Sequence, residues 1–244
     1  MMKFGLKVHH SDLDSLMYIG PEALEFVIHA EDLDGTLIDL GTLDESERKK
    51  AVDIVKRSID LAERLKAGVL VCHPGGVYKE HRELSHSGLV YSMRQLKAYA
   101  GDRVDVLMEN MPDVYWYNGE LWATCLFKDW KEIRDVLHET GMRLCLDLSH
   151  ARLYCNSRHI DLNLYVTVLK PYIGHLHISD ALGVSSEGLQ IGDGETNFKS
   201  LLKILDGLDV ILVPEIVDGH KNNGAGFKMA KKRLSRLGYI KKDE

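Results

Sequence analysis

Six short apolar segments of this sequence end in a histidine or a carboxylate. The six residues are His29, His73, Glu109, Asp147, His177 and Glu215, in the segments VIHA, VCHPGG, LMENMP, CLDLSH, HLHIS and LVPEI. Imidazole nitrogens and carboxylate oxygens are ligands for zinc, manganese, iron and cobalt. Ionised carboxylates are rarely buried without a partner, so three carboxylates at the ends of apolar segments need one. The pattern predicts a site for a divalent metal ion.

Two further histidines lie close to these positions. His150 follows Asp147 by three residues, and His175 precedes His177 by two. Residues two apart in a strand point to the same side, so His175 is a candidate for a buried partner of His177. A single histidine at a strand end is more often a hydrogen-bonded structural residue. The presence of a histidine or carboxylate at the ends of six successive strands favours a metal site over that alternative.

The elements that must position these residues alternate along the chain. Apolar runs rich in Val, Ile and Leu predict strands at 3–8, 24–30, 68–73, 104–110, 143–148, 173–179 and 209–216. Helical spacing of apolar residues predicts helices at 44–68, 83–100, 128–140, 161–170, 197–206 and 225–236. Alternation of this kind is typical of parallel strands joined by right-handed crossovers.

A closed barrel explains the polar strand ends better than an open sheet. The carboxyl ends of the strands converge on one face of a parallel barrel, whereas an open sheet would spread them apart. We therefore predict an α/β fold, a (β/α)8 TIM barrel, as a single domain over residues 1–244. The segment between the first two strands is too short for a helix and another strand. One β/α unit is therefore abbreviated or missing near the N-terminus.

Composition narrows the class of protein. The formal net charge of -6 argues against a dedicated nucleic-acid-binding protein. The four cysteines form no C-x-x-C pair, which favours a reduced, cytoplasmic protein. The N-terminal residues lack the apolar stretch of a signal peptide, and no apolar run approaches the length of a membrane span.

The motifs HPGG, ENMP, DLSHA, HLHISDA, LQIGDGETNF and VPEI together resemble the xylose isomerase-like barrel superfamily. It includes sugar isomerases, ketose epimerases, inosose-processing enzymes and endonuclease IV. The resemblance covers roughly residues 24–216 and rests on the order and spacing of the motifs. It also makes a homodimer plausible.

The resemblance implies a set of metal ligands. Glu109, Asp147, His177 and Glu215 match the quartet that holds one divalent ion in the isomerases and epimerases. Manganese or zinc is the first expectation, and magnesium, cobalt or iron are alternatives. His29 and His73 match histidines that hold an added zinc in endonuclease IV, with Glu109 bridging. His150 matches a residue that binds substrate in epimerases and a third zinc in endonuclease IV.

Two departures bear on the reaction. Endonuclease IV has an Asp-x-His pair after the strand of His177, where this chain has GVSSEGLQIGDGE without a histidine. Some ketose epimerases carry an arginine shortly after the metal-binding histidine, and HISDALGV has none. We favour a metal-dependent isomerase or epimerase of a small sugar or polyol, with or without a phosphate. An endonuclease IV-like phosphodiesterase is the alternative, and a non-catalytic binding protein is the third hypothesis.

In the favoured reaction, Glu109 and Glu215 exchange a proton with the substrate from opposite sides of the ion. His150 binds a substrate oxygen, and His29 and His73 contact the substrate when only the quartet holds an ion. Trp116 either forms an apolar wall for the sugar or packs on the barrel as part of a surface loop. The segment 191–198 either binds an anion at a helix N-terminus or forms a turn capped by Thr196 or Asn197.

Overall fold

Seven parallel strands form a closed barrel in the computed structural model, which describes residues 2–8, 25–30, 37–117 and 119–241. The strands are β1 (Lys3–Val8), β2 (Glu25–His29), β3 (Val69–Cys72), β5 (Asp105–Glu109), β8 (Arg143–Asp147), β9 (Ile173–Ile178) and β12 (Ile211–Pro214). Their order around the barrel is β1-β12-β9-β8-β5-β3-β2. The predicted barrel is confirmed, with seven strands in the described part of the chain.

The abbreviated β/α unit lies between the first two strands, as the sequence predicts. β1 pairs directly with β2, through Gly5 to Val8 against Glu25 to Ile28. The segment 9–24 between them lies outside the described residues. β1 also pairs with β12, which closes the barrel.

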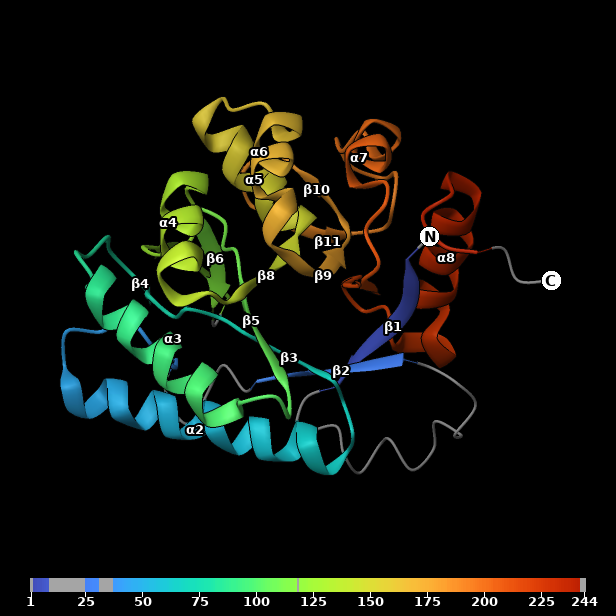
Figure 1. Ribbon diagram of the computed structural model, residues 1–244. Coiled ribbons are helices and arrows are strands. Elements are labelled where there is room, and N and C mark those ends of the chain that lie inside the picture. Colours follow the sequence, from blue (N-terminus) through green and yellow to red (C-terminus); the bar gives the residue numbers. More distant parts are fainter. Residues whose placement is uncertain (1, 9–24, 31–36, 118, 242–244) are drawn as a thin grey trace.

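Helices follow the strands and cover the outside of the barrel (Figure 1). They are α2 (Glu45–Arg64), α3 (His86–Ala100), α4 (Trp130–Thr140), α5 (Leu148–Arg158), α6 (Leu162–Leu169), α7 (Phe198–Leu205) and α8 (Lys221–Leu237), with the short 3-10 helix η2 (Lys170–Tyr172) after α6. α2 and α3 lie side by side against β2, β3 and β5. In α8, Asn222, Asn223 and Gly224 have positive φ, so the regular helix begins where the sequence predicted it, near residue 225.

One helix was missed by the sequence analysis. α5 begins directly after β8, without a loop. Asp147 is both the last residue of β8 and the N-cap of α5, and its Oδ1 accepts a hydrogen bond from the backbone N–H of His150 at 2.6 Å. A strand that turns into a helix at a single residue leaves no polar loop to mark the boundary.

Two small sheets at the carboxyl ends of the strands were also not predicted. β4 (Val77–Tyr78), β7 (Glu120–Thr124) and β6 (Val114–Tyr117) form an antiparallel sheet. β10 (Asp180–Leu182) and β11 (Ser186–Leu189) form a hairpin after β9. Both sheets bring loop residues to the face where the polar strand ends meet.

The barrel interior has an apolar layer beneath the polar residues. Its members are Val27, Val71, Leu107, Cys145 and Val213, which pack together in the closed barrel. Each of them precedes a polar strand-end residue by two positions, so both point inward. A larger core, which includes Leu70, Met108 and Leu144, fills the space between the barrel and its helices.

Candidate metal and active site

The carboxylate of Glu109 lies at the centre of the converging strand ends. Its Oε2 atom is 3.1 Å from His177 Nδ1, 3.3 Å from His29 Nε2 and 3.4 Å from His73 Nε2. Its other oxygen, Oε1, is 3.4 Å from His150 Nδ1. The barrel therefore brings together residues from four strand ends and the start of α5 around one buried carboxylate.

Four of the predicted ligands form a compact donor set. Glu109, Asp147, His177 and Glu215 each offer one ligand atom, and these atoms lie within 4.8 Å of one another. His177 Nδ1 is 3.1 Å from Glu215 Oε1 as well as from Glu109. Among the described residues, Glu109 Oε1, His177 Nδ1 and Glu215 Oε1 are buried and make ion-pair contacts, but none of these contacts has the geometry of a hydrogen bond. Buried polar atoms normally have a partner, so this mixed N and O set fits a divalent ion.

His29 and His73 form a second group with Glu109. His29 Nδ1 lies 2.9 Å from the carbonyl oxygen of Ala30, which can only accept, so Nδ1 carries the proton. The other ring nitrogen, Nε2, lies within hydrogen-bond distance of the Glu109 carboxylate, at 3.3 Å. A histidine held by a backbone carbonyl at Nδ1, with Nε2 directed at the site, has the arrangement of a metal-binding histidine.

The charges around Glu215 keep it ionised. Burial raises the pKa of this carboxyl, but the positive charges of His177 and Lys7 outweigh burial and lower it to about 2. Lys7, on β1, places its Nζ 2.6 Å from Glu215 Oε1. Burial likewise opposes ionisation of Glu109, yet His177 and His73 hold its pKa well below the usual range.

Asp147 and His150 form a second charged pair beside Glu109. Burial raises the pKa of Asp147 to about 7, although the nearby His150 charge favours ionisation. Burial opposes the charged form of His150, but Asp147 and Glu187 raise the pKa of its imidazole well above the ordinary value. His150 Nδ1 lies 2.9 Å from the carbonyl oxygen of Asn110, and its Nε2 lies 3.1 Å from Glu187 Oε2.

Several residues of this site were missed by the sequence analysis. Lys7 lies near the end of the predicted strand 3–8, and a lysine at the end of an apolar strand is a usable signal for such a site. Asn110 accepts from the backbone N–H of Asp147 at 2.8 Å and donates to its carbonyl at 3.1 Å, which ties the ends of β5 and β8. Glu187 reaches His150 from the β10–β11 hairpin, and no local pattern marks it.

The aromatic residue that faces the histidines is Tyr115. Its ring centroid lies 6.0 Å from that of His73 and 6.4 Å from that of His150. Trp116, the next residue in β6, is 49% exposed and donates its indole N–H to the carbonyl of Ser185 at 3.0 Å. Neighbouring residues of a strand point to opposite faces, so Tyr115 has the position that the sequence analysis considered for Trp116.

The segment 191–198 forms a turn that binds a carboxylate of the chain itself. Buried Asp180 accepts hydrogen bonds from the backbone N–H groups of Gly192 and Gly194 at its Oδ2 and of Thr196 at its Oδ1. Asn197 is the N-cap of α7 and accepts from the backbone N–H of Ser200. These N–H groups are engaged by Asp180, which leaves them unavailable to a bound phosphate.

Comparison with known proteins agrees with the architecture. Residues 17–236 match a family model described as xylose isomerase-like TIM barrel. A similar curated protein, an uncharacterized protein of Methanocaldococcus jannaschii, is 28% identical over 197 residues, which are 79% of this chain and 70% of that protein.

None of the helices in the described part of the chain has the length and apolar character needed to cross a membrane.

Solved structures share the fold at low sequence identity. A D-tagatose 3-epimerase-like protein superposes with a TM-score of 0.72 at 21% identity, over 95% of this chain and 86% of its own. A D-allulose 3-epimerase from Methylomonas sp., in complex with D-allulose, superposes with a TM-score of 0.66 at 18% identity, over 92% of this chain and 79% of its own. At these identities the similarity establishes the fold.

Proposed function

This chain belongs to the xylose isomerase-like TIM barrel family, and we propose that it is a divalent-metal-dependent isomerase or epimerase of a small sugar or polyol. The observation that carries the proposal is the pair of ionised glutamates that share one histidine. Glu109 and Glu215 both lie 3.1 Å from His177 Nδ1, yet they come from β5 and the end of β12, with β8 and β9 between them. The names of the structural neighbours, which are epimerases of ketoses, support the same class.

The ion would be held by Glu109, Asp147, His177 and Glu215. Manganese and zinc suit these ligands first, and magnesium, cobalt or iron are alternatives. When bound, a divalent ion polarises a carbonyl and its neighbouring hydroxyl, which makes the adjacent C–H more acidic.

The two glutamates provide the proton transfer. One carboxylate removes the proton from the carbon next to the carbonyl and becomes a carboxylic acid. The other, after it has taken a proton from solvent, returns a proton, in an isomerisation to the adjacent carbon or in an epimerisation to the opposite face. Glu215 is held ionised by Lys7 and His177, so it is in the form that can accept a proton. His177 fixes both carboxylates by its position between them.

The remaining residues would bind the substrate's oxygens and ring. His150 has Nδ1 engaged with Asn110, so its Nε2 is the nitrogen that can meet a substrate hydroxyl. His29 and His73 lie on the other side of Glu109. Tyr115 supplies an apolar ring beside His73 and His150, and Trp116 lies at the edge of the same hairpin. The engaged N–H groups of the 191–198 turn favour a substrate without a phosphate there.

The experiment is metal analysis of the purified protein together with a screen of ketoses in deuterated water. We expect manganese or zinc to bind, and solvent deuterium to enter one substrate at the carbon next to its carbonyl. Glu215→Gln should lose the ion held by the quartet and the deuterium incorporation. The proposal fails if no sugar exchanges deuterium in the metal-loaded protein, or if Glu215→Gln retains both the quartet ion and the activity.

A metal-dependent phosphodiesterase remains the second candidate because of one observation. His29 and His73 both face Glu109, and the three residues form a group that could hold another ion. Two ions sharing Glu109 could activate water for attack on phosphorus. Cleavage of duplex DNA containing an abasic site, tested beside the ketose screen, decides between the two reactions.

A further inference from the structure

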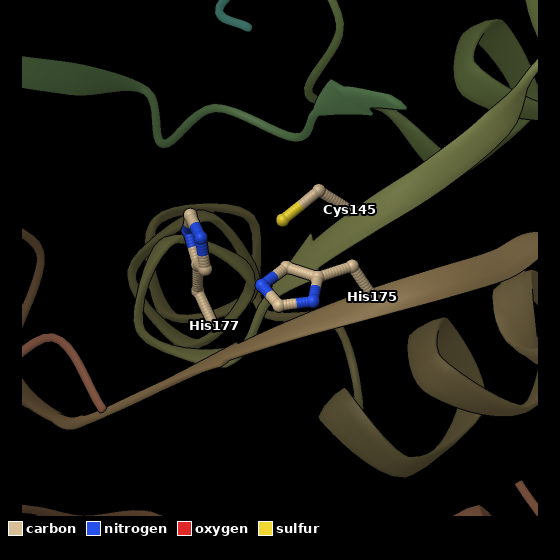
Figure 2. Close-up of side chains that lie close together, drawn as sticks. All are labelled: Cys145, His175 and His177. Carbon is tan, nitrogen blue, oxygen red and sulfur yellow. The ribbon is translucent and has the colours of Figure 1, made fainter. Parts of the chain in front are cut away.

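Below the proposed active site, the barrel interior contains a second group of metal-binding side chains. Cys145 on β8 pairs in register with His175 on β9, and His177 is two residues further along the same strand. Figure 2 shows the thiol and the two imidazole rings turned toward one another. One ligand atom from each residue lies within 4.8 Å of the others. The rings of His175 and His177 are 5.1 Å apart at their centroids and nearly perpendicular.

His175 is out of place in this layer unless it has a ligand. Its counterparts on other strands of the barrel are Val27, Val71, Leu107 and Val213, which pack with Cys145 in the closed barrel. His175 is fully buried, and neither of its ring nitrogens has a hydrogen-bond partner among the described residues. Buried polar side chains normally have such partners, so the two nitrogens of His175 indicate that a ligand binds here.

The second ring nitrogen of His177 could also bind an ion. Its Nδ1 faces Glu109 and Glu215, and its Nε2 has no hydrogen-bond partner in the described part of the chain. We propose that Cys145, His175 and Nε2 of His177 form a separate inner site for a thiophilic divalent ion, of which zinc is the best example. This inner site shares only His177 with the quartet, through the other ring nitrogen, and does not depend on the proposed reaction.

The donor set is chemically suited to zinc. One thiolate and two imidazoles are common zinc ligands, and sites with three protein ligands leave a fourth position open. With zinc–ligand bonds of about 2.0 to 2.3 Å, ligand atoms of a tetrahedral site lie roughly 3.5 Å apart. The present spread of at most 4.8 Å therefore closes with small side-chain rotations. On binding, Cys145 releases its thiol proton to solvent, and the zinc–sulfur bond forms.

The inner ion would fix the ring of His177. With Nε2 bound below, Nδ1 is held toward Glu109 and Glu215 above, so the inner site would orient one ligand of the outer site. When both ions are bound, His177 bridges them and also loses its ring N–H proton.

Cobalt substitution tests the inner site by a signal that does not depend on activity. Cobalt bound to a thiolate gives a sulfur-to-cobalt charge-transfer absorption in the near ultraviolet. We expect wild-type protein loaded with cobalt to show this absorption and Cys145→Val to lose it completely. Valine occupies three other positions of the same layer, so it suits this site. Cys72→Val is the matched control, because Cys72 is equally buried on β3 but lies outside the group.

Two further measurements test the inner site without relying on the Cys145→Val variant. Glu215→Gln, which removes an outer ligand, should keep the thiolate absorption. X-ray absorption of the zinc-loaded wild-type protein should show a sulfur neighbour at about 2.3 Å, and this needs no variant that might misfold. The proposal is overturned if the wild-type protein shows only nitrogen and oxygen neighbours. It is also overturned if the cobalt–thiolate absorption persists in Cys145→Val.

Discussion

Lys7 Nζ lies 2.6 Å from Glu215 Oε1, so the first and last strands of the barrel meet in an ion pair at the candidate active site. β1 and β12 are neighbours in the closed barrel, although they lie at opposite ends of the described chain. The pair places a positive charge on a carboxylate that would both bind an ion and transfer a proton.

Removing this charge should change both metal affinity and the pH dependence of the reaction. Lys7→Met removes an ammonium that lowers the pKa of Glu215, so this pKa should rise. A base must be ionised to act, and the acidic limb of the profile of kcat/KM against pH should therefore move to higher pH. Metal affinity should increase, roughly tenfold, because one competing cation is lost. Lys3→Met, at the other end of β1, is the control, and equal profiles for both variants would contradict the role of Lys7.

Asp147 should contribute to metal binding at a cost in the stability of the metal-free protein. Burial raises its folded-state pKa to about 7, well above the ordinary value for an aspartate. Stability associated with its protonated form is present below about pH 4 and is lost as the pH rises through 7. Asp147→Asn should thus stabilise the metal-free protein at pH 8, on the order of 1 to 3 kcal/mol, and keep the N-cap of α5.

The same variant should bind the quartet ion at least 100-fold more weakly, because the amide oxygen carries no charge. Thermal unfolding with a chelator and isothermal titration with manganese measure the two effects. A metal-free Asp147→Asn protein less stable than wild type at pH 8 would show that the carboxylate is satisfied without an ion.

Glu187 should set the basic limb of the pH profile through His150. Nδ1 of His150 lies 2.9 Å from the Asn110 carbonyl, so only the imidazolium can also donate from Nε2. Glu187, 3.1 Å from Nε2, helps to raise the pKa of His150. Glu187→Gln should move the basic limb of kcat/KM to lower pH. An unchanged limb would mean that the charge of His150 is not needed for substrate binding.

Tyr115 should matter more than Trp116 for substrate affinity. Tyr115 faces His73 and His150, whereas the indole of Trp116 is bonded to Ser185 on the other hairpin. We expect Tyr115→Ala to raise KM by about tenfold or more, the loss of one aromatic contact. Trp116→Phe, which loses the hydrogen bond and part of the ring, should change KM by less. Comparable effects would instead assign the apolar wall to Trp116.

The sequence by itself determined the alternation of strands and helices and the polar residues at the strand ends. These features are local, because an apolar run that ends in His, Asp or Glu is visible without knowledge of its neighbours. The spacing of two residues between Val27 and His29, or between Leu107 and Glu109, already indicated that each pair points the same way. Convergence of these residues followed from the parallel barrel.

The tertiary structure decided which side chains meet. Closure with seven strands brings Lys7 to Glu215, and the β10–β11 hairpin brings Glu187 to His150. The direction in which β6 turns gives Tyr115 the place beside the histidines. The pairing of Cys145 with His175 depends on the register of β8 against β9, which includes an irregularity between Leu144 and Cys145. Contacts of this kind join residues far apart in the chain, so barrel register and loop geometry fix them, and neither is encoded in a short stretch of sequence.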